Sequence, residues 1–222
     1  AFDGRMDILE NPSVRWTQLG WSELSGLRAN PGRYVAYASF GLNHYWGGYD
    51  VWGYHVVNVV LHLLNAGLVY ALALATLARV PALESQRLRP SVAPWIAATA
   101  ALVFVAHPIQ TQAITYVVQR MTSLCAFFYL SALLLYVHGR TAATPRRRGA
   151  LLAGGFLCWG LALGSKEIAA TLPLAVLLYE WFFFRDLSLP WIRRNVGFGL
   201  LALVCVAGVA GLYLGSAPLD RL

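Results

Sequence analysis

The feature that most constrains this chain is a series of apolar runs that are long enough, or nearly long enough, to cross a lipid bilayer. The runs at 54–78 and 196–215 approach the roughly 20 residues that a spanning helix needs. Hydrophobic residues make up 58% of the 222 residues and charged residues only 12%. Such a composition is typical of a membrane protein rather than of a soluble domain. We therefore expect an all-α integral membrane protein.

Polar segments divide the chain into two regions. Residues 1–50 are rich in aromatic residues and contain Asn-Pro, Pro-Gly and Gly-Gly steps, which predict a loop segment with short helices at the membrane interface. Residues 51–222 form the predicted transmembrane domain. Its spans, about six in number, are predicted at roughly 54–78, 92–106, 121–138, 150–163, 169–184 and 196–215.

The arginines indicate how these spans are oriented. The net charge of +7 is carried by sixteen arginines and one lysine. Ten arginines follow alternate crossings, namely Arg79, Arg87, Arg89, Arg140, Arg146, Arg147, Arg148, Arg185, Arg193 and Arg194. The positive-inside rule places these loops in the cytoplasm and segments 1–50, 107–120 and 164–168 together on the opposite side. Since this rule accounts for the basic charge, we expect the lipid bilayer as a partner and no nucleic acid.

One predicted span carries a polar stripe. His55, Asn58, His62 and Asn65 recur at helical spacing on an otherwise apolar run. Polar residues on a spanning helix usually face other helices and form hydrogen bonds with them, so we expect helix-to-helix contacts here. A ligand site is the alternative. A metal site is not expected, because the run offers no third ligand near the two histidines.

The segment HPIQTQAITYVVQR at 107–120 interrupts two apolar runs. His107-Pro108 is expected to end the helix at 92–106, since proline disfavours helical geometry in the residue before it. On the same side lie the acidic residues of the N-terminal segment and the pair Lys166-Glu167. This pair needs partners, because an unpaired charge near the bilayer costs several kcal/mol.

These residue types suit group transfer from a phosphorylated lipid. A carboxylate can act as general base on a hydroxyl nucleophile, and arginine, lysine and histidine can hold a phosphate leaving group. Simpler roles are also open. Arg120 is placed to extend from a helix end toward the membrane surface, and the cysteines Cys125, Cys158 and Cys205 are expected to be small core residues.

Four stretches carry a resemblance to a known family: FDGRMDILENP (2–12), SFGLNHYWGGYDVWGYHVVNVVLHLLNAGLVY (39–70), HPIQTQAITYVVQR (107–120) and SKEIAATLPLAVLLYEW (165–181). They resemble bacterial relatives of the transmembrane and tetratricopeptide-repeat O-mannosyltransferases, within the GT-C glycosyltransferase superfamily. The resemblance covers nearly the whole chain. It implies a GT-C-like membrane fold, here as its N-terminal membrane part, in a bacterial inner membrane with segments 1–50, 107–120 and 164–168 in the periplasm.

The resemblance also implies a chemistry. Family members transfer a sugar from a dolichyl- or polyprenyl-phosphate donor to a protein acceptor, and a carboxylate of the first outer loop is the expected base. Asp3 matches that carboxylate, whereas Gly4 stands where a second acid is common. The expected substrate-binding residues are His107, Gln110, Gln112, Arg120, Lys166 and Glu167. Apart from the lipid-linked sugar, no cofactor or metal is expected.

Two functions therefore stand side by side. The first is a GT-C-type glycosyltransferase that acts on the outer membrane face, of which this chain is a fragment. The second is a non-catalytic structural or assembly subunit of a larger membrane protein complex, which the change to Gly4 favours. A transporter fits less well, because the polar residues gather on one face rather than along the spans.

Overall fold

The computed structural model describes residues 8–27, 32–80, 89–185 and 187–214. Within these ranges the regular structure is helical and includes no strand. The N-terminal part contains η2 (Pro12–Val14), α2 (Trp21–Gly26) and α3 (Tyr34–Gly47). Six long helices follow, namely α4 (Val51–Leu77), α6 (Arg89–Ala106), α8 (Arg120–Arg140), α9 (Pro145–Leu163), α10 (Leu172–Phe184) and α12 (Val196–Leu214). A short helix, α11 (Leu189–Arg194), joins α10 to α12.

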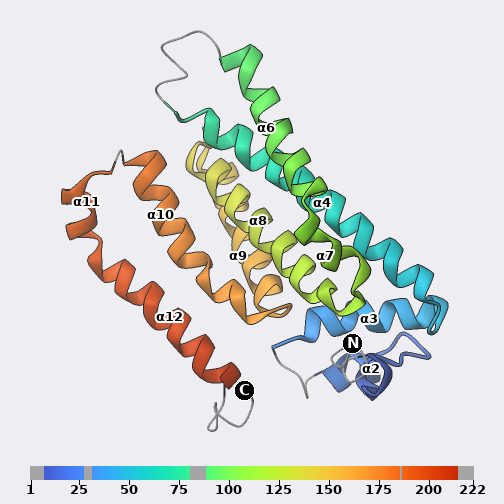
Figure 1. Cartoon of the computed structure of the whole chain (residues 1–222). Helices are drawn as coiled ribbons and strands as arrows, with labels where there is room; N and C mark the ends of the chain where they lie inside the picture. The colour runs from blue at the N-terminus through green and yellow to red at the C-terminus, as the bar shows by residue number, and fades with distance from the viewer. Residues whose placement is uncertain (1–7, 28–31, 81–88, 186, 215–222) are drawn as a thin grey trace.

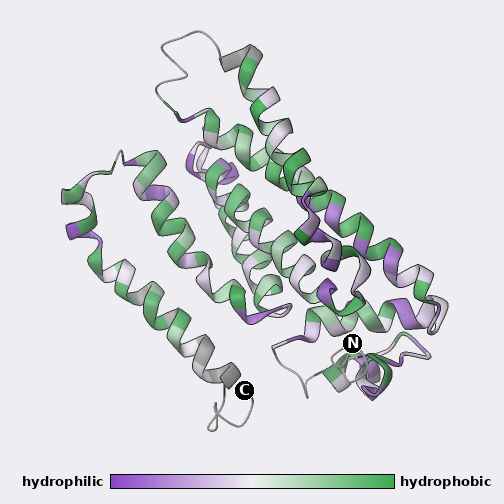
Figure 2. Ribbon diagram, in the orientation of Figure 1, coloured by the Kyte–Doolittle hydropathy of each residue, from purple (hydrophilic) through white to green (hydrophobic). Residues whose placement is uncertain are grey.

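Every predicted span falls on one of these long helices, and Figure 2 shows them as mostly hydrophobic. Length and composition qualify three described stretches as membrane-crossing helices: Val51–Leu77, Val117–Arg140 and Glu167–Phe184. The bent pair Val92–Ala106 and Pro108–Thr115 would make a fourth if the two helices form one span. The protein is thus an all-helical integral membrane protein. Six crossings, and the division at residue 50, stay predictions.

Side-chain caps set where two of the helices begin. The Asp50 side chain accepts a hydrogen bond from the backbone N–H of Trp52 at 3.1 Å and caps α4. The Thr144 side chain accepts from the N–H of Arg147 at 3.4 Å and caps α9, with Pro145 in the first turn. Helix α9 therefore begins five residues before the predicted span 150–163 and carries its arginines in the first turn, while the bounds of that span stay a prediction.

The segment after α6 is broken, as His107-Pro108 predicted. Helix α6 ends at Ala106, and His107 is extended. A chain of short helices follows: η4 (Pro108–Gln110), α7 (Thr111–Thr115) and η5 (Val117–Gln119). The helix axis bends by 53° at this break. The chain then enters α8, which packs between α4 and α9 (Figure 1).

The three polar segments predicted to share one side of the membrane meet at one end of the helices, which we call the polar end. The backbone N–H of Val35 donates to the carbonyl of Gly164 at 2.8 Å, which joins α3 to the C-terminal end of α9. The Lys166 ammonium donates to the hydroxyl of Thr122 at 2.9 Å, which joins the start of η6 (Glu167–Thr171) to α8. Described parts of the first and third segments are thus in contact, whereas a shared membrane side and its periplasmic position stay predictions.

Arg120 connects the polar end across three helices. Its side chain is 0% exposed. The guanidinium donates to Asn58 Oδ1 at 3.0 Å and to the Tyr54 carbonyl at 2.9 Å on α4. It also donates to Asn43 Oδ1 at 2.7 Å and to the carbonyl of Ser39 at 3.2 Å on α3. The expectation that Arg120 extends from a helix end to the membrane surface was therefore wrong, because the start of α8 is covered by α3 and α4.

Two aromatic rings complete this environment. The Arg120 guanidinium carbon lies 4.8 Å from the ring centre of Phe40 and 5.2 Å from that of Tyr54. Each ring presents a negative face to the cation. Among the described residues no carboxylate forms an ion pair with Arg120. The desolvation of this cation is thus offset by neutral acceptors and aromatic rings on α3 and α4.

We predict that Arg120→Leu destabilises the protein by about 3 kcal/mol, because it leaves the buried acceptors of Asn58 and Tyr54 and the half-buried acceptor of Asn43 unpaired. Thermal unfolding in detergent should show a midpoint lower by roughly 6–12 °C. Arg147→Leu, at an exposed site on α9, is the control and should leave the midpoint nearly unchanged. Equal midpoints for the two variants would contradict the structural role of Arg120.

Candidate functional site

The polar stripe of α4 contacts backbone carbonyl groups of the neighbouring helices. Its four members, with their partner carbonyls, are His55 (Ile114, 3.1 Å), Asn58 (Ile114, 3.4 Å), His62 (Val105, 3.3 Å) and Asn65 (Ser123, 3.0 Å). A carbonyl oxygen only accepts, so the contacting ring nitrogen of each histidine carries the proton. The structure thus confirms helix-to-helix contacts for this stripe.

Ile114 lies where the backbone is free to accept these bonds. It is next to the last residue of α7, and Tyr116 adopts an extended conformation before η5 begins. Carbonyls in the last turn of a helix lack intrahelical partners and must be satisfied from elsewhere. His55 and Asn58 satisfy this one, and so they hold the segment after the break against α4.

A cleft of about 310 Å³ opens beside this junction. It is formed by the N-terminal segment, the start of α4 and the segment between α7 and α8. The lining residues are Ile8, Leu9, Tyr49, Val51, Tyr54, His55, Thr115, Tyr116, Val117 and Val118. The volume is at the lower end of the range for small-molecule sites, and such sites are commonly apolar with a few polar groups.

The polar atoms of this cleft come from tyrosine, threonine and histidine. Tyr54 is 4% exposed, donates its hydroxyl to the Gly48 carbonyl at 3.2 Å and packs its ring against the Arg120 guanidinium. His55 is half-buried, with Nδ1 engaged by the Ile114 carbonyl. Through Tyr54, the wall of the cleft is therefore continuous with the residues that contact Arg120. The mixture suits a ligand with an apolar chain and a hydroxyl-rich head.

Three predicted binding residues lie before this cleft in the broken segment and are not among its lining residues. His107 is exposed, and its Nδ1 accepts a hydrogen bond from the N–H of Ile109 at 3.3 Å, which caps η4. Gln110 is half-buried and Gln112 is exposed. They lie in the same segment between α6 and α8 as Thr115 and Tyr116, but their binding roles stay predictions.

Arg120, Lys166 and Glu167 occupy other positions around α8. Arg120 lies behind Tyr54 and offers no exposed atom to a ligand in this conformation, so its contact with a donor phosphate stays a prediction. Lys166 has the partner that its charge requires, the Thr122 hydroxyl. Glu167 Oε2 is buried and has no hydrogen-bond partner among the described residues. Neither Lys166 nor Glu167 lines the cleft.

The predicted base Asp3, and with it Gly4, lies outside the described residues. The residues that follow, Ile8 and Leu9, form one wall of the cleft. Within the described part of the chain no group of three or more metal-ligating side chains occurs.

Sequence reasoning missed most of the cleft. Tyr49, Thr115 and Tyr116 carry no spacing that marks them as binding residues. His55 was noticed only as part of the polar stripe. The signal that could have found them is the irregular segment itself, because binding residues are often carried by irregular segments that join rigid helices.

Comparison with known proteins agrees with the family resemblance. The mouse protein O-mannosyl-transferase TMTC2 is 29% identical over 237 residues, which cover 98% of this chain and 26% of that protein. The human TMTC2 is 30% identical over 203 residues, covering 88% of this chain and 22% of that protein. The Drosophila melanogaster protein O-mannosyl-transferase Tmtc2 is 34% identical over 152 residues, which cover 64% of this chain and 14% of that protein.

Other comparisons add no further relative. No protein-family profile matches the chain, and no solved structure matches it. The chain spans about a quarter of the length of the mouse and human relatives. Within that span, the chain is homologous to proteins named protein O-mannosyl-transferase TMTC2, which supports the family resemblance seen in the sequence.

Proposed function

We propose that this chain is part of a GT-C-type glycosyltransferase that moves a sugar from a polyprenyl-phosphate donor to a protein acceptor. The observation that carries the proposal is the alignment of nearly the whole chain with proteins named protein O-mannosyl-transferase. Those names make mannose the first sugar to test. The cleft supports the proposal, because its apolar lining suits the lipid and its tyrosine, threonine and histidine groups suit a sugar.

Asp3 is the proposed general base. It precedes Ile8, a residue of the cleft wall, by five positions in the sequence. Its carboxylate would accept the proton of an acceptor hydroxyl while the oxygen attacks the anomeric carbon of the sugar. The bond from that carbon to the phosphate oxygen breaks, and polyprenyl phosphate leaves with the electron pair. His107, Gln110, Gln112, Arg120, Lys166 and Glu167 are the proposed donor-binding residues.

The test is sugar transfer by the full-length protein that contains this chain, from polyprenyl-phosphate mannose to an acceptor peptide. Asp3→Asn should lower kcat at least 100-fold, since a general base typically contributes 10²–10⁴-fold. Glu23→Gln on α2, an acidic residue of the same N-terminal segment, is the control and should keep full activity. Transfer that survives in Asp3→Asn would exclude this base.

The second candidate is a structural or assembly subunit of a larger membrane complex. Gly4 favours it, because the family commonly has a second acid at that position. If the unmutated full-length protein transfers no sugar from polyprenyl-phosphate mannose or glucose and co-purifies with other membrane proteins, the subunit function replaces the transferase.

We place the polar end on the periplasmic side of a bacterial inner membrane, which rests on the arginine-rich loops and the family resemblance. In a variant without native cysteines, a cysteine at the exposed position Gly47 should react with a membrane-impermeant maleimide on intact spheroplasts. A cysteine at the exposed position Arg147 should react only after the membrane is opened. The reverse labelling pattern would invert the topology.

A further inference from the structure

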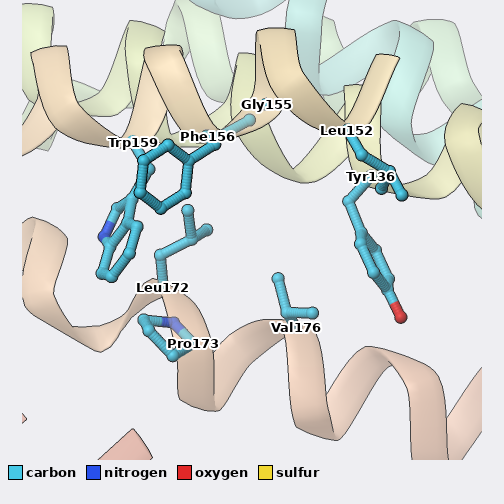
Figure 3. Close-up of a pocket in the computed structure, with 9 residues that line it drawn as sticks. Tyr136, Leu152, Gly155, Phe156, Trp159, Leu172, Pro173 and Val176 are labelled. Carbon is cyan, nitrogen blue, oxygen red and sulfur yellow. The ribbon is translucent and has the colours of Figure 1, made fainter. Parts of the chain in front are cut away.

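A second cavity, of about 220 Å³, lies between α8, α9 and α10, away from the cleft. Figure 3 shows Leu152, Phe156 and Trp159 of α9 with Tyr136 of α8 on one side, and Leu172, Pro173 and Val176 of α10 on the other. Phe156 is 71% exposed, so the cavity is a groove that opens onto the surface of the helices. Its lining is apolar apart from the Tyr136 hydroxyl.

Each of the three helices places a charged residue one turn beyond this groove, at the same end. Arg140 follows Tyr136 by four residues on α8, and Glu180 follows Val176 by four on α10. Arg148 precedes Leu152 by four on α9, which runs in the opposite direction. Residues four apart lie on one face of a helix. Each of these charged residues therefore lies on the groove-facing side of its helix, one turn beyond the groove.

Hydrogen bonds join the charged ends of α8 and α10. Glu180 accepts two hydrogen bonds from Arg140, at 2.9 Å and 2.7 Å, and one from the Tyr136 hydroxyl at 2.6 Å. Arg185 donates to the same carboxylate at 3.2 Å. Arg79, at the end of α4, and Arg140 each lie 5.0 Å from the ring centre of Phe184.

Among the residues that the structure describes at this end, arginines outnumber carboxylates. The described arginines at this end are Arg79, Arg140, Arg148 and Arg185, and the one described carboxylate is Glu180, which pairs with Arg140 and Arg185. Arg146 and Arg147 add further exposed positive charge in the first turn of α9, which contains no acidic residue. A hydrocarbon groove with surplus arginines at one end matches a ligand that has an apolar chain and an anionic head.

We propose that this groove binds a phospholipid with an anionic headgroup from the surrounding leaflet. One acyl chain lies between Phe156 and Val176, past Tyr136. The phosphate lies at Arg148 and the exposed edge of Arg140, whose side chain is 22% exposed. Guanidinium groups suit this role, because they bind phosphate oxygens in pairs. Basic pockets between transmembrane helices are known to hold such headgroups. The site is independent of the transferase proposal.

The test uses the full-length protein in phosphatidylcholine nanodiscs with a trace of phosphatidylglycerol that carries a diazirine on one acyl chain. After illumination, mass spectrometry should find lipid adducts on peptides 152–159 and 172–176. Unlabelled phosphatidylglycerol should compete for these adducts, whereas added phosphatidylcholine should not. Val176→Trp fills the groove and should remove the adducts, while Val204→Trp, at an exposed site on α12, should retain them.

Matched arginine variants test the headgroup. Arg148→Gln should weaken competition by phosphatidylglycerol about fivefold, as expected for one arginine near the membrane surface. Its neighbour Arg147→Gln, turned away from the groove face, should weaken it less than twofold. The proposal is overturned if the groove peptides carry no adduct. That result is expected if another helix or a second copy of the protein covers the groove. Equal competition by the two lipids, or equal effects of the two variants, would overturn the anionic headgroup.

Discussion

The buried guanidinium of Arg120 is the constraint on which the polar end depends. A cation taken out of water costs several kcal/mol unless its donors are met. At the first residue of α8 it also lies near the positive end of the helix dipole. The acceptors that compensate come from Ser39, Asn43, Tyr54 and Asn58, and therefore from both α3 and α4. If α3 or α4 moved away, the buried guanidinium would lose hydrogen-bond acceptors, which is unfavourable. Helices α3, α4 and α8 therefore form one unit.

This unit explains why a cleft persists where the backbone is irregular. Tyr54 belongs to both features, because its carbonyl and ring contact the Arg120 guanidinium and the same residue lines the cleft. Ile114, fixed by His55 and Asn58, holds the opposite wall in place. The other end of the helices is organised differently, around Glu180 and several arginines. Among the described residues, one end thus surrounds the buried Arg120 with neutral acceptors, and the other holds more arginines than carboxylates, a difference between the ends that suits a protein fixed across a bilayer.

Hydropathy and proline placement were sufficient to locate the long helices and the break at His107-Pro108, because both depend on local sequence. The start of α9 at Pro145 does not follow from hydropathy, since Thr144 and Pro145 begin the helix in a stretch whose arginines are typical of a loop. The burial of Arg120 and its hydrogen-bond partners could not be predicted, because the acceptors lie 62 to 81 residues away in the chain. The cleft was missed for the same reason: its walls come from three separate segments.

The central claim is that the cleft at the polar end binds the lipid-linked sugar donor. The most direct measurement is photo-crosslinking of the full-length protein with a benzophenone analogue of polyprenyl-phosphate mannose, followed by peptide mapping. Adducts are predicted on peptides 49–55 and 115–118, lost when Val51→Trp fills the cleft and retained in Val59→Trp, an exposed site on the same helix outside it. Adducts confined to other segments, or unchanged in Val51→Trp, would contradict the account.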